Sequence, residues 1–337
     1  MSTKKARRLT LPSFPTSTAP IELSGEGEDE RLGKGSPLKT LTILSVGPLI
    51  SQIVQSLYGI VNLFWVSKAI GNIGLEVFGA VYVVDFISLG FADYLMTSLD
   101  IRVSYLFGEK SRIDDCSQIF VDFIRISFLF GLLLPCLILP ICRPLIEWFG
   151  SPEEVSKDCL IYLYPTAFGS FFTFLYMTTC GLIQAEGHSF IFGLAQAASL
   201  LLNMACLCPL FLLGFHMGIY GASLATIVSQ AIVAIALTVL IFMGKFTVKP
   251  QFRMFGRKFS KETWKAMRIG FASLIANYSY SIPELMIQKY LISSAQKIGA
   301  YDPIIKVWGV IEKLYQFAGG SNEAFAAGLM PSASYAF

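Results

Sequence analysis

The stretch that decides the fold runs from Ser189 to Gly244 and reads SFIFGLAQAASLLLNMACLCPLFLLGFHMGIYGASLATIVSQAIVAIALTVLIFMG. It contains no Asp, Glu, Lys or Arg, and a second uncharged run extends from Cys159 to Ala185. A helix needs about 20 mainly apolar residues to cross the roughly 30 Å hydrocarbon core of a bilayer. The two runs are therefore long enough for three membrane-spanning helices.

The composition of the whole chain also indicates a membrane protein. Of its 337 residues, 54% are hydrophobic and 15% are charged, whereas a soluble domain carries about 25% charged residues. The mean hydropathy is +0.61. The 26 Lys and Arg against 23 Asp and Glu leave a net charge of +3, which is too small to indicate nucleic-acid binding. The seven cysteines form no CxxC pair and no metal-ligand spacing with His, so we expect no disulfide framework, metal site or cofactor.

We predict an all-α polytopic membrane protein, because unpaired backbone groups cannot be left in lipid. The hydrophobic pattern predicts eight spans with approximate ends, at 42–66, 77–106, 118–142, 159–183, 190–213, 219–243, 264–292 and 303–330. Lys and Arg are concentrated in the tail 1–40, near residue 110 and in the loop 245–262. By the positive-inside rule, the N-terminus is expected to be cytoplasmic, in the plasma membrane or an internal membrane.

An internal repeat relates the first and seventh spans with an offset of 226 residues. Both spans carry four polar residues at spacings i, i+4, i+7 and i+11, which form one stripe along a helix. The first stripe is Ser51, Gln55, Tyr58 and Asn62, and the second is Asn277, Ser281, Glu284 and Gln288. Six spans separate the two starts, so the repeats run in the same direction. This predicts two halves related by an axis along the membrane normal, as in one class of transporters.

Three segments resemble the multidrug and toxic compound extrusion (MATE) family. The first span, with Gly47-Pro48 and the segment 60–66 followed by Ile70-Gly71, is similar to the opening helix of that family. The most specific similarity runs from Gly181-Leu-Ile-Gln-Ala-Glu-Gly187 through Asn203 to Gly218-Ile-Tyr-Gly-Ala-Ser-Leu-Ala-Thr226. The end of the chain, 328–335, resembles the close of the eighth helix of the family. The similarity extends from about residue 38 to the last residue.

The resemblance implies a protein with two lobes of six helices each, and this chain carries eight of those helices. We therefore expect a tail at 1–40, a six-helix lobe at 41–244, a basic cytoplasmic linker at 245–262 and a partial second lobe at 263–337. The chain is expected to be a partial sequence, and the alternative is a genuine eight-helix protein. We expect a monomer in the lipid bilayer.

The resemblance also implies secondary antiport, in which organic cations or amphiphilic drugs leave in exchange for protons or sodium ions. Two alternatives stay open: a flippase for lipid-linked oligosaccharides of a related fold, and a membrane bundle without transport activity. A membrane enzyme would need a cluster of catalytic side chains within the spans. Both histidines fall in turns, so we expect no enzyme.

The candidate residues for substrate or cation binding are polar groups inside the spans. Glu284 is the one carboxylate in the two matched stripes, and it lies opposite Tyr58; by resemblance it aligns with a glutamate of eukaryotic-type members. Asn62 stands where the family often has an acid, and the Asp that often follows the match of Asn203 is absent, which puts a prokaryote-like cation site in doubt. Each candidate has a structural alternative, such as a hydrogen bond between helices. The set is Glu284, Gln288, Asn62, Tyr58, Asn203, Asp93 and Glu312.

The second span adds an expectation about three aspartates that share one face. Asp85, Asp93 and Asp100 follow at spacings of eight and seven. Asp93 is the candidate to line a central cleft. Asp100 lies beside Arg102 near the predicted cytoplasmic edge, so we expect an interfacial ion pair between them.

Overall fold

The computed structural model describes residues 37–109, 112–148, 153–298 and 319–335 except 321 and 323. These residues form long helices, in the order α2 (Pro37–Ile70), α3 (Asn72–Gly108), α4 (Ile113–Trp148), α5 (Glu153–Phe168), α6 (Ser170–Ala185), α7 (Ser189–Leu201), η2 (Leu202–Leu207), η3 (Leu210–Gly214), α8 (Gly218–Phe242), η4 (Phe252–Gly256) and α9 (Lys261–Lys297). A further helical segment covers the described part of 319–335.

The predicted all-α membrane architecture is confirmed. The expected spans 42–66, 77–106, 118–142 and 264–292 lie inside α2, α3, α4 and α9, and 219–243 ends one residue beyond α8. By length and composition, three helical stretches of the described residues can each cross a membrane: Ile113–Trp148, Ser189–Gly214 and Gly218–Phe242. The bent pair of α5 and α6 adds a fourth if it is counted as one span.

The expected span 159–183 is helical but is not straight. It consists of α5 and α6, which are bent by 52°. Pro165 has no N–H to donate to the preceding turn, and Gly169 at the break places its own N–H 2.8 Å from the Pro165 carbonyl. The hydrophobic pattern continues through the break, so hydropathy alone could not locate it.

The expected span 190–213 is helical throughout but changes its winding. After α7 the chain passes through two π-helical segments, η2 and η3, with Pro209 between them. π-Helical turns are rare and occur frequently at functional sites. Asn203, one of the candidate residues, lies in η2.

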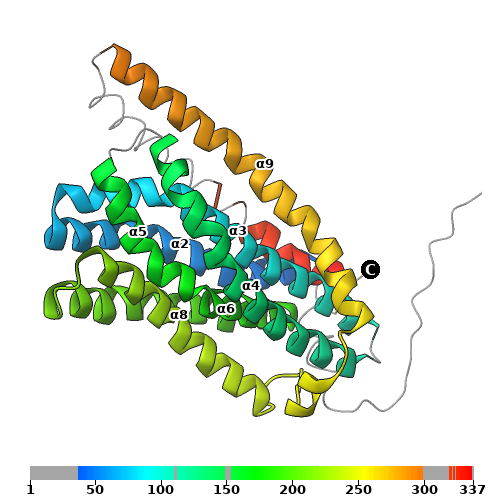
Figure 1. Ribbon diagram of the computed structural model, residues 1–337. Coiled ribbons are helices and arrows are strands. Elements are labelled where there is room, and N and C mark those ends of the chain that lie inside the picture. Colours follow the sequence, from blue (N-terminus) through cyan, green and yellow to red (C-terminus); the bar gives the residue numbers. More distant parts are fainter. Residues whose placement is uncertain are drawn as a thin grey trace, which may run out of the picture.

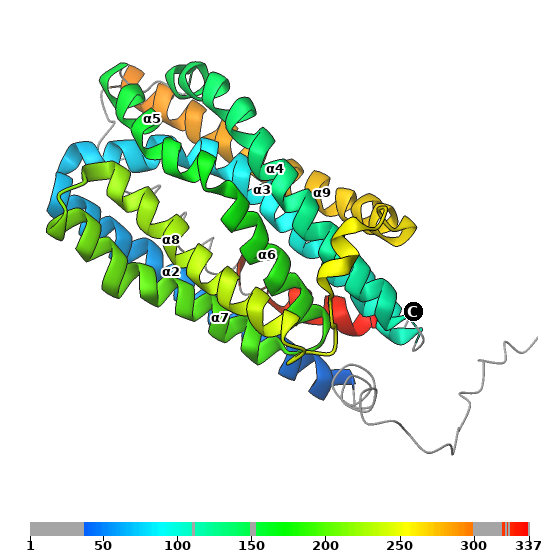
Figure 2. The same cartoon turned by 60° about the horizontal axis from the view of Figure 1, so that its bottom comes forward.

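Helices α2 to α8 form a bundle, and α9 runs along its outside (Figures 1 and 2). Helix α3 packs against α6 on one side and α9 on the other, while α2 packs against α7, and α8 against α5 and α6. We call the end of the bundle at which residues 243–260 connect α8 to α9 the linker end. Residues 1–36 of the predicted tail 1–40, and most of the predicted eighth span 303–330, lie outside the described residues.

Small residues set the closest helix crossing. Helices α2 and α7 meet at Gly47 and Gly193, where a Cβ added to Gly193 would lie 2.6 Å from the Gly47 carbonyl oxygen and 2.7 Å from its Cα. The Ser189 hydroxyl donates a hydrogen bond to the Leu44 carbonyl one turn earlier on α2. Such close backbone approach is how membrane helices gain van der Waals contact without a hydrophobic driving force.

Substituting Gly193 with Ala should destabilise the bundle, because the added methyl meets backbone atoms that cannot rotate away. Overpacking of this kind costs about 1–3 kcal/mol, which exceeds the gain in helix propensity from Gly to Ala. We expect a lower melting temperature in detergent for Gly193→Ala. The matched control is Gly256→Ala, since no heavy atom lies within 4 Å of a Cβ added there. Equal melting temperatures for the two variants would contradict this account of the α2–α7 crossing.

Candidate functional site

The candidate site is the interface between α3 and α9, which are far apart in sequence but in contact along half of α9. The Tyr94 hydroxyl donates to the Met267 carbonyl at 3.0 Å, and the Tyr278 hydroxyl donates to the Ile87 carbonyl at 3.0 Å. Gly90 makes room for Tyr278, since a Cβ on Gly90 would lie 2.7 Å from the tyrosine oxygen. Each tyrosine therefore bonds to the backbone of the other helix, and the two bonds lie at different positions along the interface.

Between these two positions lies a direct contact of candidate residues. The side-chain amide of Asn277 on α9 donates a hydrogen bond to Oδ2 of Asp93 on α3, at 2.6 Å. Both side chains are only partly buried. The sequence placed Asn277 at the start of the polar stripe of the seventh span and Asp93 on a separate helix. The structure brings these two residues together.

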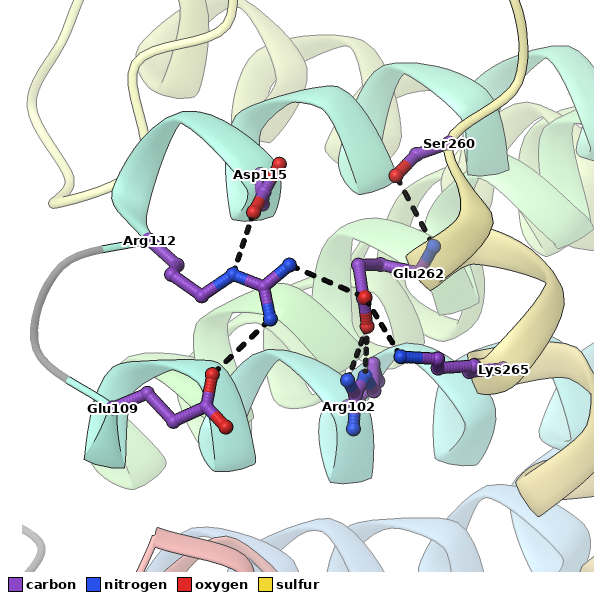
Figure 3. Close-up of polar contacts among 7 residues, drawn as sticks. All are labelled: Arg102, Glu109, Arg112, Asp115, Ser260, Glu262 and Lys265. Atoms are coloured by element: carbon purple, nitrogen blue, oxygen red, sulfur yellow. Dashed lines mark hydrogen bonds and ion pairs between the residues drawn. The ribbon is translucent and has the colours of Figure 1, made fainter.

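At the linker end, a cluster of charges closes the same interface (Figure 3). The Glu262 carboxylate on the first turn of α9 accepts hydrogen bonds from Arg102 on α3, including one from Nε at 2.9 Å. It also accepts from Arg112 at 3.2 Å and from Lys265 at 3.0 Å. The side chains of Glu262 and Arg102 are 8% and 10% exposed, so the pair is shielded from water.

The remaining contacts of the cluster orient Arg112. Its guanidinium donates to Asp115 at 2.7 Å and to Glu109 at 3.1 Å. Arg112 therefore joins the end of α3, the start of α4 and the start of α9 (Figure 3). The Ser260 hydroxyl accepts a hydrogen bond from the Glu262 N–H at 3.2 Å, which caps the first turn of α9.

The charge state of Glu262 follows from these partners. Burial opposes ionisation, but hydrogen bonds from Lys265 and Arg102, together with the charge of Arg102, outweigh it and lower the pKa of the Glu262 carboxyl to about 2. Its acceptor contacts with three cations are therefore intact at every physiological pH.

Two further buried carboxylates at the linker end hold the connection 243–260. Glu186, which is fully buried, accepts the N–H groups of Thr247 at 3.1 Å and Val248 at 2.9 Å. Asp122 on α4, also fully buried, accepts from the Ser260 N–H at 2.8 Å and the Thr263 hydroxyl at 2.7 Å. The connection is therefore bonded to the bundle through its backbone.

Asn203 lies away from the α3–α9 interface, on η2. Its side-chain nitrogen donates to the Thr226 hydroxyl on α8 at 3.1 Å, which is the helix–helix hydrogen bond that we expected as its structural role. The side chain is 1% exposed, and its oxygen Oδ1 has no hydrogen-bond partner among the described residues. A buried, unsatisfied oxygen costs free energy.

For the other candidates, the structure gives only the position of each residue along a helix. Glu284 and Gln288 lie on α9, two and three turns beyond Asn277, and Tyr58 and Asn62 lie on α2. At about 3.6 residues per turn, Glu284 is only about 20° around the helix from Asn277. Their side chains are not described. Glu312 lies outside the described residues.

The expected ion pair between Asp100 and Arg102 is wrong. Arg102 reaches Glu262 on another helix, and the described hydrogen bond of the buried Asp100 comes from the Ser104 hydroxyl at 3.2 Å. Residues two apart on a helix point in different directions, so their nearness in sequence did not imply contact. Sequence reasoning also missed Glu262, Glu186 and Asp122. The signal for Glu262 was available, because it is the one acid between residues 245 and 268 among eight Lys and Arg.

Contacts between described residues reproduce the offset of the internal repeat. Gly90 on α3 packs against Tyr278 on α9, and Gly320 packs against Gln52 on α2. Tyr278 follows Gln52 by 226 residues (278 − 52), and Gly320 follows Gly90 by 230 (320 − 90). A second pair of contacts behaves alike: Ser98 with Gly270, and Ser45 with Gly328. Exchanging the two repeats therefore converts one interface into the other, as a two-fold axis requires.

The comparisons with known proteins agree with this architecture. The MatE family model matches residues 48–210. The "Probable multidrug resistance protein YoeA" of Bacillus subtilis (strain 168) is 22% identical over 236 residues, covering 69% of this chain and 50% of the relative. The "Multidrug export protein MepA" of Staphylococcus haemolyticus (strain JCSC1435) is 23% identical over 319 residues, covering 92% of this chain and 67% of the relative. The chain thus spans half to two thirds of the length of these relatives.

The fold is shared with solved transporters. One is the outward-facing conformation of a multidrug resistance MATE family transporter of the MOP superfamily. It superimposes with a TM-score of 0.78 at 20% identity, covering 93% of this chain and 67% of that chain. The family model thus assigns residues 48–210 to the multidrug and toxic compound extrusion (MATE) family, and the superposition shows that the chain shares the fold of its solved transporters.

Proposed function

We propose that the protein is a secondary transporter that exports organic cations or amphiphilic drugs in exchange for protons or sodium ions. Members of the family are transporters rather than enzymes. The two relatives described above are named as multidrug resistance and multidrug export proteins. A multi-pass helical membrane protein without an ATP-binding motif is suited to exchange driven by an ion gradient.

The observation that carries the proposal is the hydrogen bond between Asp93 and Asn277. It positions a carboxylate inside the α3–α9 interface, between helices that belong to different repeats. Glu284 lies two turns farther along the same face of α9. A carboxylate attracts an organic cation, and protonation removes that attraction, so proton and substrate compete for one group. Such competition is sufficient for antiport.

Alternating access requires that the α3–α9 interface opens at the linker end, which we propose faces the cytoplasm. In the structure that end is closed by Glu262, Arg102 and Arg112. Because the pKa of Glu262 is about 2, cytoplasmic protons do not break these contacts. In this proposal the coupling ion acts at another group, and the candidates are Asp93 in the interface and Glu284 farther along α9.

Asn203 offers a second position for the coupling ion. Its buried Oδ1 lacks a hydrogen-bond partner among the described residues, and the Thr226 hydroxyl lies beside it. Hard cations prefer oxygen ligands of this kind. If sodium is the coupling ion, this oxygen is suited to coordinate it, and Tyr58, Asn62 and Gln288 are polar groups for the substrate.

Glu284→Gln should abolish coupled efflux in the complete gene product, because the neutral amide cannot exchange a proton for a cation. Asn62→Ala should only weaken efflux, since no charge is lost. Both variants are measured by ethidium efflux from proteoliposomes under an imposed pH or sodium gradient, at matched reconstitution levels. Normal transport by Glu284→Gln, with the pH dependence of the parent, would transfer the role to Asp93.

Glu262→Gln should open the linker end, because Arg102 loses its buried counter-charge. Removing one partner of a buried ion pair is strongly destabilising. The measurement is the spin-label distance between Lys39→Cys on α2 and Arg268→Cys on α9, with the exposed Cys136 and Cys206 replaced by alanine. We expect a new, longer distance in Glu262→Gln.

The control for this measurement is Glu109→Gln, which removes a more exposed partner of Arg112 and leaves the Arg102 contact intact. It should keep the parent distance, because exposed ion pairs contribute little. A parent-like distance in Glu262→Gln would show that the charge cluster does not hold the interface closed.

The same distance should be independent of pH between 5.5 and 8. The pKa of Glu262 is lowered from 4.5 to about 2, so its stabilising contacts are complete above pH 4.5 and are lost only as the pH falls toward 2. Distances in detergent at pH 5.5, 6.5 and 8 test this directly. A transition near pH 6 that persists in a variant with neutral Asp93 and Glu284 would place a titrating group within the cluster itself.

A further inference from the structure

We propose that residues 243–268 form a binding surface for anionic phospholipid headgroups of the membrane leaflet at the linker end. This surface, which we call the basic collar, comprises the connection 243–260, which includes η4, and the first two turns of α9. It is independent of the transport proposal, because it depends on the connection and not on the α3–α9 interface.

The connection is bonded to the end of α6 and to α4. Glu186 binds the N–H groups of Thr247 and Val248, and the Ser117 hydroxyl accepts the Lys249 N–H at 3.3 Å. Farther along, Arg125 donates to the Arg257 carbonyl at 3.0 Å. Figure 1 shows the connection between the end of α8 and the start of α9. The backbone of the connection is therefore held against α4 and the end of α6.

Exposed aromatic side chains of the collar continue the lipid-facing sides of the two helices. On α8, Ile235 and Val239 are each 50% exposed, and the ring of Phe252, which is 79% exposed, stacks on Phe242 at 4.9 Å. On α9, the outward-facing residues Ile275 and Phe271 are followed toward the linker end by Trp264, which is 62% exposed. Aromatic residues at such ends occupy the boundary between hydrocarbon and headgroups.

Most cations of the collar have no ion-pair partner in the described part of the chain. It contains eight Lys and Arg, and its one acid, Glu262, is buried and already bonded to Arg102, Arg112 and Lys265. The other cations are exposed and have no ion-pair partner among the described residues: Lys245, Lys249, Arg253, Arg257, Lys258, Lys261 and Arg268.

Unpaired cations next to exposed aromatic rings match an anionic lipid surface. Each Lys or Arg near such a surface adds to the attraction, while the aromatic rings insert beside the acyl chains. A soluble acidic protein would meet the same charges, but the aromatic rings are directed along the lipid-facing sides of α8 and α9. The chemistry therefore favours phospholipid with a phosphate-bearing, negatively charged headgroup.

The test uses Trp264 as a reporter of nearby lipid. The chain with Trp65, Trp148 and Trp308 replaced by Phe is reconstituted in phosphatidylcholine that contains either brominated phosphatidylglycerol or brominated phosphatidylcholine. Bromine quenches tryptophan fluorescence on contact, so the ratio of the two quenching constants is the relative affinity of the surface for the anionic lipid. We expect a ratio of about five or more at low salt.

The charge variant is Lys258→Gln/Lys261→Gln/Arg268→Gln, which removes three unpaired cations around Trp264. Its quenching ratio should fall to near one. The matched control, Lys68→Gln/Lys157→Gln/Lys297→Gln, removes three cations outside the collar and should keep the parent ratio. A parent ratio near one, or an unchanged ratio in the charge variant, would overturn the proposal.

Two further measurements separate the alternatives. Inorganic phosphate, compared with chloride at equal ionic strength, should not change the parent ratio; loss of the preference in phosphate alone would indicate a site for the free anion and overturn the lipid assignment. If the single-tryptophan chain fails to fold, native mass spectrometry of the parent and both triple variants with phosphatidylglycerol and phosphatidylcholine replaces it. More retained phosphatidylglycerol in the parent and control than in the charge variant supports the collar, and equal retention in all three overturns it.

Discussion

The carboxylate of Glu262 is the group on which the closed form of the molecule depends. It is nearly excluded from water, and it accepts hydrogen bonds from cations on α3, on the α3–α4 connection and on its own helix. Arg102 is equally buried and has no other acid among its described contacts. Each charge thus requires the other, because an unpaired buried charge is costly. The position of α9 against α3 follows from this requirement.

Two more carboxylates extend the same principle around the linker end. Asp122 binds the start of α9 to α4, and Glu186 binds the connection to the end of α6. All three acids accept hydrogen bonds from backbone N–H groups or from cations that would otherwise need water. As a result, the basic side chains of the connection are directed outward. The internal acids thus determine both the closed interface and the exposed charge of the basic collar.

The two ends of the α3–α9 interface differ in chemistry, and this difference suits alternating access. Near the linker end the contacts are ionic and insensitive to physiological pH, because Glu262 stays charged. Halfway along α9 the contacts are hydrogen bonds, from Asn277 to Asp93 and from Tyr278 to the Ile87 carbonyl. Beyond it, α9 presents exposed apolar residues such as Ile282 and Ile287. The closed end and the candidate carboxylates are therefore separate parts of one interface.

Hydropathy predicted the helices well but could not predict their winding. The spans expected at 42–66, 77–106 and 264–292 lie within single helices, because an apolar run of sufficient length has no other stable form in lipid. The bend at Gly169 and the π-helical turns around Asn203 follow from particular hydrogen bonds. These leave the apolar pattern unchanged, so the sequence carried no sign of them beyond Pro165 and Pro209.

The polar stripe on the seventh span likewise shows what a sequence pattern can predict and what it cannot. Its spacing predicted that the four polar residues share one face of the helix, and on that face Asn277 bonds to Asp93. The periodicity of a helix defines a face but not the helix that covers it, so the partner could not be read from the pattern. Nearness in sequence was misleading for Asp100 and Arg102, which bind Ser104 and Glu262 instead.

The sequence by itself determined that the chain is a helical membrane protein, that its first and seventh spans are repeats, and that it resembles the MATE family. These properties depend on composition and local spacing, which each segment carries alone. Only the tertiary structure decided which carboxylates are buried and which cations they bind. The reason is physical: a charge chooses its partner by distance and shielding from water, and both are set by helices that are remote in sequence.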